Sequence, residues 1–113
     1  MHRLTIAVTG LNATENPAPG VPVIRALRAA DPSVRIVGLG YDALDPGGYM
    51  DGVADHVYMM PFPSRGADVL YDRIVEIHAR TPIDVLVPTL DAELPAWLKL
   101  ESRLTALGIR TLL

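Results

Sequence analysis

The sequence predicts an α/β protein, a doubly wound sheet of five parallel strands in the order 3-2-1-4-5 with helices on both faces. Two observations indicate this fold. Five apolar runs of strand length are rich in Val, Ile and Leu and lack the alternation of half-exposed strands, which is typical of buried parallel strands. Helical patterns separate most of these runs, and parallel strands need such right-handed crossovers. The order follows if the first crossover runs one way and the later ones the other.

The five predicted strands are short and lie at regular intervals along the chain. They cover residues 4–9, 34–39, 56–60, 84–88 and 109–113. Between the second and third strands, a Pro-Gly-Gly turn precedes residues 49–54, which leave room for one or two helical turns.

Three helices are predicted, over residues 22–30, 67–79 and 94–107. Each has apolar side chains at helical spacing on one side and charged side chains on the other. Asp-Pro and Thr-Pro pairs end the first two helices, because the residue before a proline disfavours helical geometry. In the third, Trp97 belongs to the inward face, and Gly108 stands at the position where helices end in a left-handed glycine.

Composition limits the kind of protein. A chain of 113 residues, 50% of them hydrophobic, fits one domain. The net charge is −3, so the chain lacks the broad positive field that would attract nucleic acids or anionic membranes. Neither is therefore an expected partner. Without cysteine there is no disulfide or thiolate chemistry, and the three scattered histidines predict no metal site. No apolar run suits a membrane span or signal peptide, so we expect a cytoplasmic protein.

The fold predicts where a ligand would bind. In doubly wound sheets, ligands lie beyond the carboxyl ends of the strands. Here that edge would gather residues 10–20, 40–46, 61–65 and 89–93.

Two segments on this edge are candidates for binding an anion or nucleotide. Gly10, Asn12 and Gly20 belong to the loop between the first strand and the first helix, where backbone N–H groups can hold an anion. The loop matches neither nucleotide-binding glycine motif, and the alternative is that its glycines only let the chain turn. Asp42 follows the second strand, where dinucleotide-binding domains keep a ribose-binding carboxylate. Its surroundings also suit a simple turn.

The segment after the fourth strand is the candidate for contact with a substrate. Thr89, Asp91 and Glu93 follow a strand that ends at a proline, and they precede the third helix. The strand-end rule places them on the ligand edge. The alternative is that Asp91 or Glu93 only interacts favourably with the positive end of that helix.

Four segments together resemble a known family. They are residues 5–10 (TIAVTG), 20–27 (GVPVIRAL), 37–46 (VGLGYDALDP) and 84–94 (DVLVPTLDAEL). In this order they resemble the Rossmann-like N-terminal domain, the pre-ATP-grasp domain, of ATP-grasp enzymes of the carbamoyl-phosphate-synthase-large-subunit-like and biotin-carboxylase-like kind. The resemblance covers residues 1–113 as a single domain. In that family an ATP-grasp domain follows, and the two domains join a carboxylate to an amine or thiol through an acyl-phosphate made with ATP and magnesium.

The resemblance implies a division of labour. The family's ATP-binding lysines and metal-binding residues belong to the ATP-grasp domain, which is absent from this chain, and Lys99, its one lysine, falls in the third predicted helix. The first loop also departs from the glycine-rich turn that relatives often carry. We therefore expect no catalytic residue and no cofactor here, and a chain that is inactive alone. It would form one wall of the cleft for a small carboxylate, with Asp91 and Glu93 nearest the substrate.

The resemblance also implies a partner for this domain. The expected partner is an ATP-grasp domain, in the same polypeptide or a separate subunit, and a domain without it would expose apolar surface and could self-associate. The rival hypothesis is a free-standing Rossmann-like module that binds a nucleotide or small anion through Asp42 and the loop of residues 10–20. A dinucleotide-dependent reductase or epimerase is not expected, because no residues remain for a substrate domain.

Overall fold

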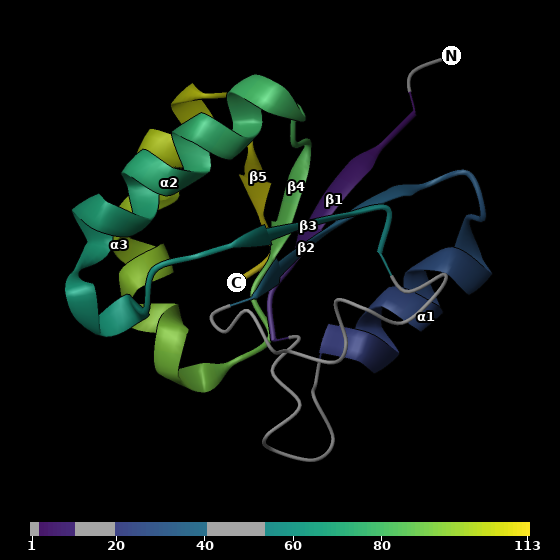
Figure 1. The fold of residues 1–113 in the computed structure, drawn as a ribbon, viewed down its shortest axis with the longest axis horizontal. Coiled ribbons are helices and arrows are strands. Elements are labelled where there is room, and N and C mark those ends of the chain that lie inside the picture. Colours follow the sequence, from purple (N-terminus) through teal and green to yellow (C-terminus); the bar gives the residue numbers. More distant parts are fainter. Residues whose placement is uncertain (1–2, 11–19, 41–53) are drawn as a thin grey trace.

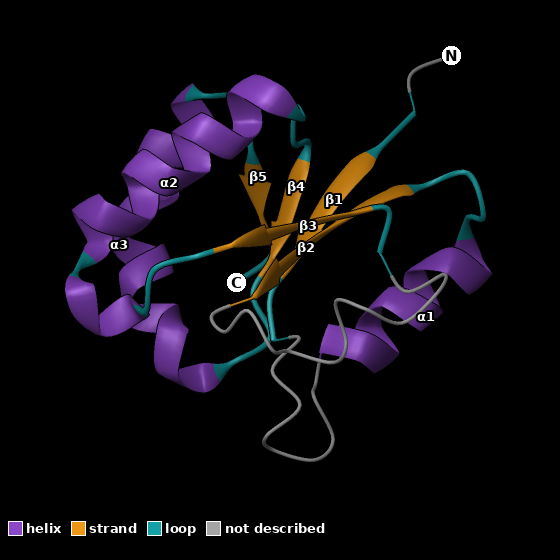
Figure 2. Cartoon of the chain, viewed as in Figure 1, coloured by secondary structure: helices purple, strands orange, loops and turns teal. Residues whose placement is uncertain are grey.

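A computed structural model of the chain describes residues 3–10, 20–40 and 54–113. Its five strands form one sheet in the order β3-β2-β1-β4-β5, and every neighbouring pair is parallel (Figures 1 and 2). The strands are β1 (Thr5–Val8), β2 (Arg35–Gly40), β3 (His56–Met59), β4 (Val85–Val87) and β5 (Arg110–Thr111). The predicted fold class and strand order are confirmed.

Three helices of the described residues cover the two faces of the sheet. Helix α1 (Gly20–Ala30) packs on one face, and α2 (Ala67–Arg80) and α3 (Leu94–Ala106) pack side by side on the other (Figure 1). Two short 3₁₀ turns, η2 (Pro63–Arg65) and η3 (Asp91–Glu93), lead into α2 and α3. Most of the short helix predicted within residues 49–54 lies outside the described residues.

The alternating directions of strand side chains divide the core into two layers. On the α1 side, Ile6 and Ile36 pack against Ile24 of the helix. On the other side, Leu86 packs with Ile74 and Trp97, among other residues from α2 and α3. The indole of Trp97 is fully buried, as its helical spacing predicts.

Element boundaries differ from the predicted ones at a few points. Helix α1 begins at Gly20, two residues before Pro22, and strand β5 has two residues where five were predicted. Ile109 does not join β5, because its N–H donates to the carbonyl of Leu104 at the end of α3 (2.9 Å). Gly108, at φ +89°, ends this helix as predicted.

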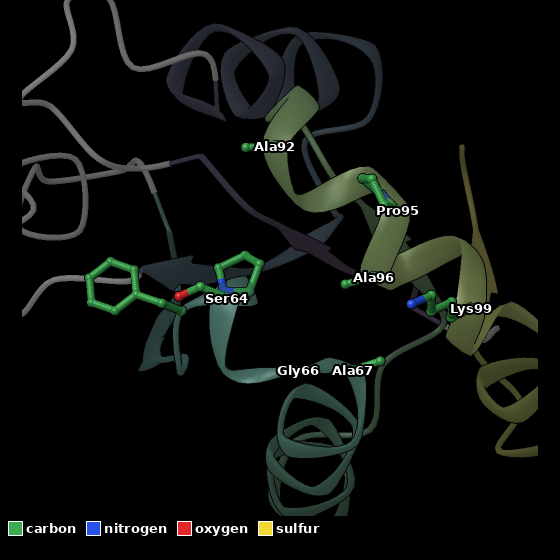
Figure 3. Close-up of a pocket in the computed structure, with 9 residues that line it drawn as sticks. Ser64, Gly66, Ala67, Ala92, Pro95, Ala96 and Lys99 are labelled. Carbon is green, nitrogen blue, oxygen red and sulfur yellow. The ribbon is translucent and has the colours of Figure 1, made fainter.

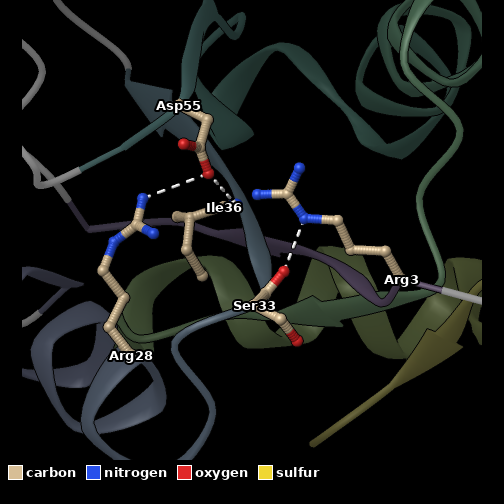
Figure 4. A network of polar contacts seen from close by, with 5 residues as sticks. All are labelled: Arg3, Arg28, Ser33, Ile36 and Asp55. Carbon is tan, nitrogen blue, oxygen red and sulfur yellow. Dashed lines mark hydrogen bonds and ion pairs between the residues drawn. The ribbon is translucent and has the colours of Figure 1, made fainter.

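The amino end of the sheet is held by carboxylates (Figure 4). Asp55 accepts hydrogen bonds from the backbone N–H of Ile36 (2.7 Å) and from Arg28 (3.1 Å). Burial raises the pKa of Asp55, but these two hydrogen bonds and the charges of Arg28 and Arg3 outweigh it, so the pKa lies below its ordinary value of 3.8. Asp55 therefore joins the start of β3 to β2 and α1.

Candidate functional site

The strand order changes direction between β1 and β4, and the residues after these two strands meet there. Thr89 donates its backbone N–H to the hydroxyl oxygen of Thr9 (2.9 Å) and its own hydroxyl to the carbonyl of Thr9 (3.0 Å). We call Thr9, Gly10, Gly20 and Thr89 the switch-point cluster. Because crossovers leave β1 and β4 in opposite directions, this is the place where doubly wound sheets bind small molecules.

Both predicted loop glycines belong to the switch-point cluster, and they contact each other. The Gly20 N–H donates to the Gly10 carbonyl (2.9 Å). Gly10 has φ +75°, and a Cβ there would lie 1.8 Å from the Thr89 hydroxyl oxygen. A Cβ on Gly20 would lie 2.1 Å from the carbonyl oxygen of Thr9. Both positions therefore require glycine, and anion binding by this loop stays a prediction.

Glu93 is buried next to the switch-point cluster, with no exposed surface. One carboxylate oxygen accepts hydrogen bonds from the Thr9 hydroxyl and from the backbone N–H of Leu90 (3.0 Å). The other accepts the indole N–H of Trp97 (2.8 Å). These donors replace water around a carboxylate that would be costly to bury alone. Glu93 thus ties the end of β1 to η3 and α3.

The three residues predicted to contact substrate therefore have different surroundings. Asp91 is exposed at the start of η3, and Thr89 is half-buried in the switch-point cluster. Glu93 accepts hydrogen bonds from other residues of the protein. A substrate could reach Asp91 directly, whereas contact with Glu93 would require one of its hydrogen bonds to be exchanged. Contact between these residues and a substrate stays a prediction.

Sequence reasoning missed the partners of Glu93. The four-residue spacing from Glu93 to Trp97 places both on one side of a helix, a signal that could have paired them. The contact between Thr9 and Glu93 joins residues 84 positions apart, and no local pattern indicates it. Two further predicted site residues, Asn12 and Asp42, lie outside the described residues.

A groove opens between the first turns of α2 and α3 (Figure 3). Its volume is about 450 Å³, within the range of small-molecule sites. Its apolar lining consists of Phe62, Pro63, Ala67, Ala92, Pro95 and Ala96. Ser64 and Lys99 add polar groups. The predicted ligand edge included residues 61–65 and Ala92, but the part contributed by α3 was missed.

The described part of the chain shows neither a metal-binding cluster nor a membrane-spanning helix. No three His, Asp or Glu side chains there are grouped so that they could hold a metal ion. No helix there has the length and apolar character needed to cross a membrane.

Comparison with known proteins gives no assignment. No protein-family model matches the chain, and no curated protein matches it either.

Proposed function

We propose that this chain is the N-terminal, pre-ATP-grasp domain of an ATP-grasp carboxylate ligase of the cytoplasm, and that it forms one wall of the substrate cleft. The observation that supports the proposal is the position of the switch-point cluster, at the carboxyl ends of β1 and β4, where Gly10 approaches Thr89 and Gly20 bonds to Gly10. Doubly wound sheets bind small molecules at such positions. The particular reaction in the proposal is the one that the resemblance of the four segments to the family implies.

In this proposal the chain binds and orients the substrate and does not transfer phosphate. ATP and magnesium would supply the acyl-phosphate chemistry from the ATP-grasp domain, in the same polypeptide or a separate subunit. The described residues do not fit that pair of groups, because they offer no three-ligand acidic cluster and their one lysine, Lys99, lines the groove beside α3. In this proposal Asp91, which is exposed two residues after Thr89, would hold a polar group of the substrate.

Kinetics of the two-domain ligase test the proposal. Asp91→Asn should raise KM for the carboxylate about tenfold, the cost of one charged hydrogen bond, and leave KM for ATP unchanged. Asp72→Asn, which removes an exposed carboxylate from α2, is the matched control. Unchanged kinetics in both Asp91→Asn and Glu93→Gln would remove these residues from the site.

The coding sequence provides a second test. The proposal expects the codon of Leu113, or a neighbouring gene, to lead into a long α/β segment whose motifs contain lysines and carboxylates. A stop codon at that point, with no ligase fragment nearby, would contradict it.

A free-standing binding module is the second candidate function. The place of Gly10 and Gly20 supports it, because they lie together at the start of α1, and backbone N–H groups at a helix start attract anions. In this alternative the loop and Asp42 hold a nucleotide without any second domain. The two candidates differ in whether the chain alone binds a nucleotide tightly.

A further inference from the structure

The groove between α2 and α3 continues into a second hollow of about 630 Å³ along the side of α2. The two hollows share Gly66, Ala67 and Lys99, so they form one surface, which we call the α2–α3 groove. The second hollow adds Arg65 and Arg103 to its lining. One end of the groove is thus apolar and the other basic.

Two of the three cations in this groove have no ion-pair partner among the described residues: Arg65 and Lys99. Both are exposed. Figure 3 shows the Lys99 side chain directed from α3 toward the space between Ala96 and Ala67. Its ammonium group is therefore placed where the apolar and basic parts of the groove join.

The third cation is held in place by its neighbours. Arg103 pairs with Asp68 (2.8 Å) and lies over the Tyr71 ring, 3.9 Å from its centroid. Asp68 is the one carboxylate in the lining, so cations outnumber anions three to one. This local excess of positive charge occurs on a chain whose net charge is −3.

From this arrangement we propose that the α2–α3 groove binds a small organic acid with an apolar body. The alanines and prolines would cover the apolar part, while Lys99 and Arg65 would face the acid group. An inorganic anion would leave the apolar lining in water, and a neutral apolar molecule would leave both cations without a counter-charge. The proposal concerns the isolated chain and does not depend on the ligase reaction.

Titration of the ¹⁵N-labelled 113-residue chain, followed by two-dimensional NMR, tests the proposal. Hexanoate is the probe, and it should shift amide signals of residues 62–67 and 92–99 to saturation, with a Kd of about 1 mM for a ligand of this size. Hexanamide, acetate and inorganic phosphate should each bind about tenfold more weakly, because each lacks one part of the complementary chemistry. Equal binding of hexanamide or of phosphate would overturn the proposal, as would shifts that do not saturate.

Variants locate the interaction. Lys99→Gln should weaken hexanoate binding about tenfold through loss of one charged contact, whereas Arg25→Gln, which removes an exposed cation from α1, should leave it unchanged. Ala92→Trp should block the groove, with Ala29→Trp as its control on α1. Equal effects of the paired variants would overturn the proposal. Shifts at the same amides when the protein alone is concentrated would also overturn it, because a second copy would then be the occupant.

Discussion

At the scale of single residues, the buried side chain of Glu93 connects the end of β1 to η3 and α3 through hydrogen bonds. Its carboxylate has no exposed surface and accepts hydrogen bonds from Thr9, Leu90 and Trp97. Because both carboxylate oxygens can accept hydrogen bonds, all of these donors can be satisfied together. The same side chain thereby fixes the end of β1, on which the position of Gly10 depends.

Glu93→Gln should therefore destabilise the domain. A glutamine would turn its NH₂ toward one of the donors, so at least one hydrogen bond in the interior is lost, at a cost of about 1–3 kcal/mol. Asp91→Asn, an exposed change two residues away, should alter stability by less than about 0.5 kcal/mol. Urea denaturation of both variants measures the difference. Equal stability of the two variants would mean that the Glu93 hydrogen bonds contribute nothing.

Gly10 of the switch-point cluster can be compared with Gly108, which lies outside the cluster. Gly10 and Gly108 both have positive φ, but an added Cβ clashes with Thr89 at the first and meets open space at the second. Gly108→Ala should cost about 1–2 kcal/mol for the left-handed backbone alone. Gly10→Ala should cost more, because the clash adds to that strain. A melting temperature for Gly10→Ala equal to that of Gly108→Ala would show that the close approach is absent.

At the scale of elements, the sequence predicts the regular structure well because each element carries its own local signal. Period-3.6 patterns with helix-ending residues identify the three helices of the described residues, and runs rich in Val, Ile and Leu identify their five strands. Edge strand β5 is overestimated, since Ile109 bonds back to α3 and not to the sheet. The α2–α3 groove could not be predicted, because it depends on how two helices pack and not on either sequence alone.

Trp97 provides a spectroscopic check on this packing. It is the one tryptophan of the chain, and it lies fully buried between α3 and the sheet. Its fluorescence should therefore be emitted at short wavelength and be quenched by acrylamide far less than that of free indole. Quenching as efficient as for free indole would contradict the placement of α3.

At the scale of the whole molecule, the two ends of the sheet differ in character. The amino end is held by carboxylates that accept backbone N–H groups, with Asp55 bonded to Ile36 and Asp84 bonded to Thr5 (2.8 Å). The carboxyl end carries the switch-point cluster and the α2–α3 groove. In doubly wound sheets, this is the end at which ligands bind.

Acid should weaken the amino end. The pKa of Asp55 is lowered in the folded protein, so its contribution to stability is present above the unfolded pKa, near 3.8, and is lost as pH falls through the folded value. The melting temperature should therefore fall with acidification below this range. Asp55→Asn should lower the melting temperature at neutral pH and reduce the acid-induced fall. A variant that follows the unmodified chain at every pH would show that Asp55 is not part of this effect.

The central claim is that this chain supplies a substrate-side wall and has no nucleotide site of its own. Calorimetric titration of the 113-residue chain with ATP and magnesium tests it most directly. The described residues include one lysine and no acidic metal cluster, so we predict binding no tighter than about millimolar. A saturable isotherm with micromolar affinity would contradict the claim and would support the free-standing nucleotide-binding module instead.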